Sequence, residues 1–309
     1  MKPAIDRLAE RLRQAQGGEE RLRRNEPLAP YTTYRIGGPA DLVFEATTVA
    51  ELQQAWRLAY EHGVSCLVLG RGSNVLVADR GVRGLVVINR CTGYEVQPGS
   101  ILRVASGMAL TEVAERTAAE GWAGLEWSVG IPGSVGGAIV GNAGAQGGYV
   151  GDALQTVTVL DHGQVRTLAG AELGMGYRTS LFKAIPRQNG RPLILEATFA
   201  MRPADPGALA QQMQEWLQWR AERHPQEPSA GSVFKRTAQY PAGFLIEQAN
   251  LKGKRRGGAQ VSPRHANFIV NLGSATADDV RGLLEEIREA VEARFGVRLE
   301  LEIELVGEW

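Results

Sequence analysis

The sequence predicts an α+β protein with a larger domain over residues 1–202 and a smaller α/β domain over 203–309. Three observations predict this class. Short apolar runs of strand length alternate with amphipathic helical stretches along the first part of the chain. The prolines of Pro203-Ala204-Asp205-Pro206 interrupt that pattern, and the chain beyond them is mostly helical. The length of 309 residues suffices for two domains.

Each element of the larger domain follows from periodicity and turn residues. A charged amphipathic helix is expected over 3–24, interrupted at Gly17-Gly18, and an extended entry over 27–39 follows it. Two stretches with one apolar face, each stopped by a glycine, predict helices over 51–62 and 110–120. Apolar runs between turn residues predict strands over 41–46, 65–69, 75–78, 84–88, 101–105, 154–161, 164–168 and 193–201.

The smaller domain is expected to hold three helices, over 207–223, 241–252 and 276–294. The last of them opens with Thr276 and Asp279, which is the spacing of a capping box. Strands are expected over 267–271 and 298–306. The final strand alternates strictly, which predicts one face of Leu299, Leu301, Ile303 and Leu305 and an opposite face of Glu300, Glu302 and Glu304.

Composition excludes several classes of protein. The 34 basic residues balance 34 acidic ones, and KGKRR at 252–256 is only a short cluster, so no nucleic-acid partner is expected. No apolar run reaches about 18 residues and the N-terminus lacks a signal-peptide core, so a cytoplasmic protein without a membrane partner is expected. Two cysteines and four histidines without CxxC or HExxH spacing predict no metal site and fit a reducing compartment.

Two glycine-rich segments point to a ligand. Residues 130–148 read GIPGSVGGAIVGNAGAQGG, with eight glycines and no charge, and a shorter turn reads Gly70-Arg71-Gly72-Ser73-Asn74. Glycine lets backbone N–H groups approach a ligand closely, and successive N–H groups suit phosphate oxygens. Two such segments favour a dinucleotide-like ligand. Tight turns and a closely packed Gly/Ala helix are the alternative.

The shorter turn is neither a Rossmann motif nor a P-loop. GRGSNV begins as G-x-G, but Val75 occupies the third glycine position and the next residues alternate as a strand does. A Rossmann motif needs a helix at that point. GxxxxGK[ST] is absent from the chain. The turn therefore predicts a strand–turn–strand unit in which Ser73 and Asn74 face the phosphates.

The same segments carry a family resemblance. VLGRGSNVLV at 68–77 and LEWSVGIPGSVGGAIVGNAGA at 125–145 resemble the FAD-binding half of the vanillyl-alcohol-oxidase (VAO) or PCMH-type flavoproteins. Within that group the chain resembles the UDP-N-acetylenolpyruvoylglucosamine reductase family. The matching motifs are TTYRIGGPADL at 32–42, GYRTSLFK at 176–183, GSVFKR at 231–236, FLIEQANLKG at 244–253, GGAQVSPRHANFIVN at 257–271 and LEIELVGE at 301–308.

The resemblance implies a fold and a reaction. An N-terminal helix over 1–24 would precede a two-subdomain FAD-binding core over about 32–202, and a substrate-binding domain would follow. Non-covalent FAD, NADPH as hydride donor and a UDP-sugar enolpyruvyl ether as substrate are implied, in peptidoglycan precursor synthesis, and a monomer is expected. Hydride addition to the enolpyruvyl group creates an enolate, so the site needs a cation and a proton donor.

Three residues match the family's catalytic positions. Arg178 would stabilise the enolate, since a guanidinium offers fixed, permanently charged donors. Ser232 would supply the proton. Glu302 lies five residues before Gly307, as the family's glutamate precedes its glycine, and would also stabilise the enolate. A slip of two residues to Glu300 or Glu304 stays open.

The motifs also predict binding residues. The cofactor candidates are Arg35, Ile36, Gly37, Gly70, Gly72, Ser73, Asn74, Gly130, Pro132, Gly133, Val135, Gly136, Gly137, Asn142 and Gly144. The substrate candidates, all after Ser232, are Lys235, Gln260, His265 and Asn267. The chain departs from the family pattern twice. Gln146 stands where an aromatic is frequent, and 184–192 contains no tyrosine, which indicates the branch without a tyrosine-bearing insertion.

Two other functions are compatible with the cofactor motifs. The first is another VAO-type oxidase or dehydrogenase, against which the GSVFK and terminal glutamate motifs argue. The second is a catalytically silent UDP-sugar-binding protein. All three catalytic positions hold the expected residue types, which argues against it.

Overall fold

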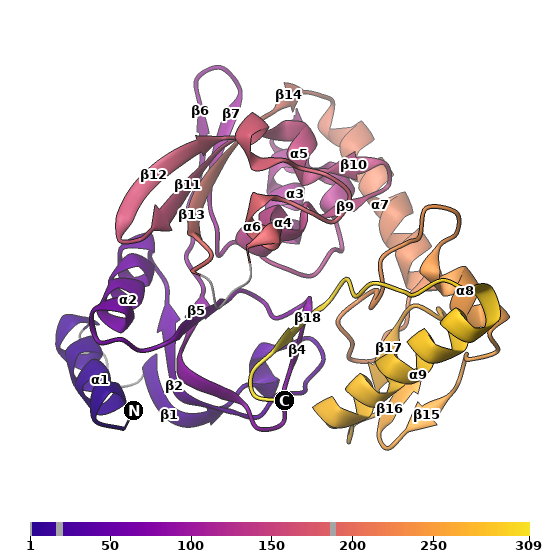
Figure 1. Cartoon of the computed structure of the whole chain (residues 1–309). Helices are drawn as coiled ribbons and strands as arrows, with labels where there is room; N and C mark the ends of the chain where they lie inside the picture. Colours follow the sequence, from indigo (N-terminus) through magenta and orange to yellow (C-terminus); the bar gives the residue numbers. More distant parts are fainter. Residues whose placement is uncertain (1, 17–20, 186–189) are drawn as a thin grey trace. The chain divides into compact units, whose positions relative to one another are not determined.

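The computed structural model describes residues 2–16, 21–185 and 190–309, and the chain divides into two compact units. The first unit comprises Met1–Arg23, Leu42–Arg71 and Gly84–Trp219, and the second Arg24–Asp41, Gly72–Arg83 and Arg220–Trp309. Each unit combines helices with sheets, as the predicted α+β class requires (Figure 1). The division differs from the expected boundary at residue 203. The first unit continues to Trp219, because α7 (Pro206–Arg223) buries Leu209 and Met213 in a cluster with Ala114 and Ala118 of α3 (Leu110–Ala119). The second unit includes Arg24–Asp41 and Gly72–Arg83, because Tyr34, Ile36 and Leu76 pack in its core.

An antiparallel five-stranded sheet forms one half of the first unit, with the order β12-β11-β13-β7-β6. Its strands are β6 (Tyr94–Gln97), β7 (Ile101–Ala105), β11 (Leu154–Asp161), β12 (Gln164–Ala169) and β13 (Leu193–Ala200). The predicted hairpin of β11 and β12 is confirmed. β6 was not predicted, because none of its four residues is buried and it therefore lacks an apolar core face. Apolar side chains of the sheet form one core with those of α3 and α4 (Val135–Gly141).

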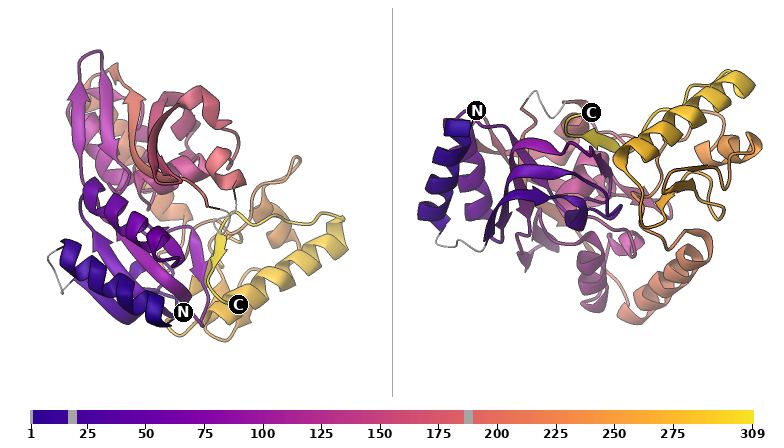
Figure 2. Two further views of the ribbon diagram at one scale, coloured as in Figure 1. Left: turned by 60° about the vertical axis from the view of Figure 1, so that its left-hand side comes forward. Right: turned by 90° about the horizontal axis from the view of Figure 1, so that it is seen from below.

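A four-stranded sheet has the order β1-β2-β5-β3, with β3 and β5 parallel. Its strands are β1 (Leu22–Pro27), β2 (Pro39–Ala46), β3 (Cys66–Leu69) and β5 (Val82–Asn89). α1 (Lys2–Gln16) and α2 (Val49–Glu61) lie side by side, and both pack into the core of this sheet (Figures 1 and 2). The helix predicted over 3–24 is wrong over residues 22–24, because Leu22 onward pairs as β1. Gly17 and Gly18 lie outside the described residues.

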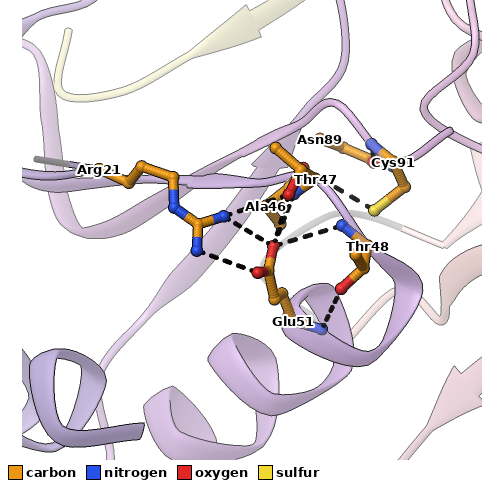
Figure 3. Close-up of polar contacts among 7 residues, drawn as sticks. All are labelled: Arg21, Ala46, Thr47, Thr48, Glu51, Asn89 and Cys91. Carbon is orange, nitrogen blue, oxygen red and sulfur yellow. Dashed lines mark hydrogen bonds and ion pairs between the residues drawn. The ribbon is translucent and has the colours of Figure 1, made fainter. Parts of the chain in front are cut away.

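Hydrogen bonds to the Glu51 carboxylate hold the start of α2 (Figure 3). The Glu51 carboxylate accepts two hydrogen bonds from Arg21, at 2.9 and 3.0 Å, and one from the Thr47 backbone N–H at 2.8 Å. Thr48 and Glu51 complete a capping box. Burial acts to raise the pKa of Glu51, but the hydrogen bonds from Arg21 and Thr47 outweigh it and lower the pKa to about 2.

Glu51 should therefore make folding stability depend on pH. Its pKa of about 2 in the folded state lies below the ordinary 4.5, so its contribution is fully present above pH 4.5 and is lost as the pH falls toward 2. Glu51→Gln should cost on the order of 2 kcal/mol at pH 7, allowing for solvent screening of Arg21, and nearly nothing at pH 2. Urea unfolding of both proteins across this range measures the difference. An equal difference at both ends of the range would contradict the assignment.

The second unit holds a three-stranded antiparallel sheet, β15 (Arg255–Arg256), β16 (Ala259–Val261) and β17 (Ile269–Asn271). α9 (Ala277–Phe295) lies along this sheet and shares its apolar core, with α8 (Ala242–Gln248) beside it (Figure 1). The predicted Thr276–Asp279 capping box is confirmed. The Asp79 carboxylate accepts the backbone N–H groups of Ala277 and Asp278, which ties the segment after β4 (Val75–Val77) to the start of α9.

The final strand is shorter than predicted. Only β18 (Glu304–Val306) is a strand, paired in parallel with β4. Bends at Glu302 and Ile303 break the expected alternation, so Leu305 is 37% exposed while Val306 is buried. The physical reason is a change of partner. The Glu302 N–H donates to the carbonyl of Val233, and the next residues turn to pair with β4.

The remaining elements are short. They are β8 (Trp122–Ala123), β9 (Gly144–Ala145), β10 (Gly148–Tyr149), β14 (Arg202–Pro203), α5 (Val150–Ala153), α6 (Leu181–Ala184) and the 3₁₀ helices η2 (Ala29–Tyr31), η3 (Glu126–Ser128) and η4 (Gly170–Leu173). Within the described ranges, no helix combines the length and apolar character needed to span a bilayer. The same ranges contain no group of three His, Cys, Asp or Glu side chains suited to a metal ion.

Candidate active site

The glycine-rich segment Gly130–Gly148 folds as a turn, the short helix α4 and the β9–β10 hairpin. Several of its glycines are required by packing. A Cβ added at Gly136 would lie 3.0 Å from Ser106 Cβ, and one at Gly144 would overlap the Tyr149 ring. The N–H groups of Val135 and Gly136 donate to the carbonyls of Met108 and Ser106, and the Val135 side chain is buried in the core. The packing alternative therefore accounts for part of this segment.

The two glycine-rich segments meet in the first unit. A Cβ added at Gly70 would overlap Ser134 Oγ and lie 3.0 Å from Ser134 Cβ. Ser134 is the N-cap of α4, and sequence reasoning missed it, although a serine before a short run of small residues is an N-cap signal. Gly130 and Gly133 have φ values of 69° and 149°, which glycine tolerates best. This side-chain-free backbone fits the phosphates of the expected dinucleotide cofactor.

The second half of the shorter turn belongs to the second unit. Gly72 has a φ of 62°, and a Cβ there would overlap the Tyr31 carbonyl oxygen and lie 2.7 Å from Thr32 Cα. The Gly72 carbonyl accepts the Thr33 N–H at 3.2 Å. The entry motif therefore packs directly on this turn, and Ser73 and Asn74 form its half-buried end.

Within the entry motif, the three cofactor candidates have different surroundings. Arg35 is exposed and has a left-handed φ of 55°. Ile36 is buried in the core of the second unit, and both its backbone groups bond the Thr32 hydroxyl. The Gly37 carbonyl accepts the Ala29 N–H. Only Arg35 of the three presents a side chain to solvent.

Arg178 lies at the tip of a tight turn in the first unit. Gly176 and Thr179 exchange two backbone hydrogen bonds of 3.2 Å, and Arg178 between them has a left-handed φ of 52°. Its Nη2 donates to the Gly144 carbonyl at 3.0 Å. The Asn142 side chain donates to the Gly176 carbonyl at 2.9 Å. The first unit thus brings Arg178 against the glycine-rich segment.

Ser232 and Glu302 are neighbours in the second unit. Ser232 pairs with Phe268 in an isolated bridge, and the carbonyl of Val233 accepts the Glu302 N–H at 2.9 Å. The Glu302 carbonyl in turn accepts the Asn74 side-chain amide at 3.2 Å. One hydrogen-bonded path therefore connects the Ser232 segment, Glu302 and the glycine turn.

The three terminal glutamates are not equivalent. The Glu300 side chain is 76% exposed and pairs with Lys235 Nζ at 3.2 Å. Glu302 is half-buried at the bend, and Glu304 lies in β18. Because of the bend, the three glutamates do not share the one face that an unbroken strand would give them.

The four substrate candidates all lie in the second unit. Lys235 bonds Glu300, and the Gln260 side chain donates to the Gly253 carbonyl. Asn267 binds both backbone groups of Phe234. His265 Nδ1 accepts the Asn267 N–H, and its ring packs against His224 and Phe268.

Both histidines of this cluster are held neutral. Burial is the main cause that lowers the pKa of His265, and nearby Lys252 acts in the same direction. Burial, with Arg220 and His265, lowers the pKa of His224 to about 4. A neutral His265 whose Nδ1 accepts a hydrogen bond carries its proton on Nε2, so the ring offers one donor.

Comparison with known proteins covers both units. A family model described as UDP-N-acetylenolpyruvoylglucosamine reductase, C-terminal domain, matches residues 223–306, and one described as FAD binding domain matches 40–168. The UDP-N-acetylenolpyruvoylglucosamine reductase 2 of Symbiobacterium thermophilum is 45% identical over 305 residues, covering 97% of each chain. The reductase of Trichormus variabilis is 42% identical, covering 91% of this chain and 85% of its own. The crystal structure of the UDP-N-acetylenolpyruvylglucosamine reductase of Thermus caldophilus superimposes with a TM-score of 0.78 at 35% identity, covering 92% of this chain and 98% of that one.

Proposed function

Because the chain belongs to the UDP-N-acetylenolpyruvoylglucosamine reductase family, we propose specific residue roles for that reaction. The protein is an FAD-dependent oxidoreductase that reduces UDP-N-acetylenolpyruvoylglucosamine in peptidoglycan synthesis, with NADPH as reductant. The observation that carries this conclusion is identity of 45% across 97% of both chains. The match over 223–306 favours this reaction over another VAO-type activity, because it covers the part beyond the cofactor fold.

FAD, when bound, carries hydride from NADPH to the enolpyruvyl group. We assign its phosphates to the backbone of Gly70, Gly72 and Gly133 and to the Ser73 hydroxyl. The close packing of Gly70 against Ser134, which brings the two glycine-rich segments together, supports this assignment. The N–H groups of Val135 and Gly136 already bond other carbonyls, so these two residues support the cradle.

Arg178 is the proposed cation at the substrate carboxylate. Hydride arrives at the β-carbon, and negative charge then spreads over the α-carbon and the carboxylate. A guanidinium keeps its charge throughout and can bind both carboxylate oxygens, so it stabilises the enolate more than the starting ether. The hydrogen bond from Arg178 to the Gly144 carbonyl supports the role, since Gly144 is one of the proposed cofactor residues.

Ser232 is the proposed proton donor. A hydroxyl is a weak acid, but an enolate carbon is basic enough to take its proton when the two are held together. The proton moves from Ser232 Oγ to the α-carbon, and solvent returns it to the serine. Glu302, as a neutral acid, would donate a hydrogen bond to the same enolate. The backbone path from Val233 to Glu302 supports this pairing.

Alanine substitution should settle which glutamate acts. We expect Glu302→Ala to lower kcat about 100-fold, the usual cost of losing one donor to a developing anion, and Glu300→Ala or Glu304→Ala to change it less than about three-fold. Steady-state kinetics with saturating NADPH measures all three variants. A loss confined to Glu300→Ala or Glu304→Ala would move the role to that residue.

The remaining roles concern the substrate. We assign the UDP-sugar to the second unit, within the predicted domain 203–309, through Lys235, Gln260 and His265. The single donor of neutral His265 suits a neutral acceptor of the ligand. We propose that the enzyme acts as a monomer in the cytoplasm, where the free thiols of Cys66 and Cys91 stay reduced.

Anaerobic spectroscopy tests the function directly. Purified protein should be yellow, should bleach with NADPH and should recover its colour when the enolpyruvyl substrate is added without oxygen. Bleaching without recovery would favour a different VAO-type dehydrogenase. Failure to bleach would exclude NADPH as the donor.

A further inference from the structure

We propose that Asn142 and Asn267, which the motifs assign to ligands, are positioning residues. Asn142 positions Arg178, and Asn267 positions Ser232. Each buries its amide against the backbone of the segment that carries a catalytic side chain. The inference rests on the proposed roles of Arg178 and Ser232. It adds that the exact positions of Arg178 and Ser232 depend on asparagine side chains that lie far away in the sequence.

Asn142 joins three segments of the first unit. The residue is 5% exposed, its Oδ1 accepts the Gly151 N–H at 2.9 Å, and its Nδ2 donates to the Gly176 carbonyl at 2.9 Å. Gly176 is the residue that closes the turn around Arg178. Asn142 is also the left-handed C-cap of α4, with a φ of 40°, a conformation that asparagine adopts readily. Asn142 therefore fixes the turn around Arg178 to the end of α4.

A second hydrogen bond holds the Arg178 guanidinium close to Asn142 in the chain. Arg178 Nη2 bonds the carbonyl of Gly144, two residues after Asn142. The base of the turn and the tip of the side chain thus contact one short stretch of chain. Without the Asn142 amide, the Gly176 carbonyl and Gly151 N–H lose these partners and the turn can shift. A displacement of about 1 Å at a reacting group can cost roughly 100-fold in rate.

Asn267 holds the Ser232 segment in the same way. The residue is 6% exposed, its Oδ1 accepts the Phe234 N–H at 3.1 Å, and its Nδ2 donates to the Phe234 carbonyl at 2.8 Å. Its own carbonyl accepts the Val233 N–H at 2.9 Å. The two residues after Ser232 are therefore bonded to one asparagine at three points. This fixes the direction in which the Ser232 hydroxyl leaves the backbone.

The hydrogen bonds of the two amides distinguish a positioning role from a ligand role. A ligand-binding amide needs an accessible polar atom, whereas both asparagines are buried, at 5% and 6% exposure, and both polar atoms of each bond the protein backbone. If Asn142 bound the cofactor directly, its substitution would also reduce FAD retention and the rates of both half-reactions. Loss of positioning should affect only the half-reaction in which Arg178 and Ser232 act.

The test uses Asn142→Gly, because glycine keeps the left-handed backbone and removes only the amide, and Asn267→Ala. FAD content is read from visible absorbance, and stopped flow gives flavin reduction by NADPH and its reoxidation by the enolpyruvyl substrate. Reoxidation should slow about 10- to 100-fold, with FAD content and reduction within about two-fold of wild type. In an Arg178→Ala background, Asn142→Gly should slow reoxidation by less than about three-fold further, since the residue acts through the arginine. Asn267→Ala should behave likewise in Ser232→Ala.

Asn89→Ala is the matched control. Asn89 is also buried, at 4% exposure, and bonds the Ser106 hydroxyl and the Cys91 N–H, but it contacts neither catalytic segment. It should lower Tm without slowing reoxidation. If Asn142→Gly fails to fold, Asn142→Asp replaces it. This variant keeps the acceptor for the Gly151 N–H, but places a carboxylate oxygen against the Gly176 carbonyl.

Several results would overturn the inference. Loss of FAD, or an equal decrease in both half-reactions, would return the asparagines to ligand binding. Unchanged reoxidation, or full additivity with Arg178→Ala and Ser232→Ala, would also exclude positioning. If Arg178→Ala or Ser232→Ala alone leaves reoxidation unchanged, the proposed catalytic role fails instead, and the two failures are therefore separable.

Discussion

Ser232→Ala is expected to leave flavin reduction by NADPH within about two-fold of wild type and to slow reoxidation by the substrate about 100- to 10,000-fold. The proton is needed only after hydride has reached the substrate, so the NADPH half-reaction does not involve the hydroxyl. The backbone of the segment should survive the change. Val233 and Phe234 are held by main-chain and Asn267 contacts that do not use the Ser232 side chain. Anaerobic stopped flow separates the two rates.

Ser229→Ala is the control for this prediction. Ser229 lies three residues earlier, and its carbonyl accepts the Thr33 hydroxyl at 2.7 Å, a contact that alanine preserves. Ser232→Cys, which restores a weak acid at the same position, should recover part of the activity. Equal damage to both half-reactions in Ser232→Ala would remove the residue from the proton-donor role.

Gly72→Ala should abolish cofactor retention. The new Cβ would overlap the Tyr31 carbonyl oxygen and lie 2.7 Å from Thr32 Cα, and both neighbours are backbone atoms that cannot rotate away. A left-handed φ of 62° adds about 1–2 kcal/mol for a residue with a Cβ. The turn that carries Ser73 and Asn74 must then move. We expect purified protein with less than about a tenth of the wild-type FAD content and a lower Tm, since the phosphate cradle depends on this backbone.

Gly63→Ala is the control that measures the backbone-conformation part of that effect without the steric part. Gly63 has the same φ of 62°, but a Cβ there would meet nothing within 4 Å. It should lose about 1–2 kcal/mol of stability from its backbone conformation and keep its FAD. Absorbance at the flavin maximum and thermal unfolding measure both variants. Equal FAD content in the two variants would mean that Gly72 does not shape the cofactor site.

Local patterns predicted most elements correctly. The hairpin of β11 and β12, the helix α2 and the Thr276 capping box all depend on residues within one or two turns of each other, and all are present. The two main errors have one cause. Periodicity around Leu22 favours a helix, but pairing with β2 makes this stretch a strand. Periodicity around Glu302 favours one long strand, but hydrogen bonds to Val233 and then to β4 bend the chain there.

The family motifs identified Arg178, Ser232 and Glu302 as candidates, but not what holds them. The glycines of the two motifs look alike in the sequence. In the fold, a Cβ at Gly70 would meet the Ser134 side chain, one at Gly136 the Ser106 side chain and one at Gly72 the Tyr31 backbone, so each glycine allows a different close contact. The asparagines of the same motifs also look alike in the sequence, and only the fold shows that their amides bond Gly176, Phe234 and Glu302.

The amino-acid sequence by itself determined the α+β class, the two glycine-rich segments, the residue types of the catalytic positions and the family. Those features depend on neighbours in the chain and on residue chemistry. Only the tertiary structure decided which backbone group each side-chain amide bonds. Asn142 bonds Gly176, 34 positions away, and Asn74 bonds Glu302, 228 positions away. A buried amide must find hydrogen-bond partners, and which backbone reaches it depends on packing of the whole unit.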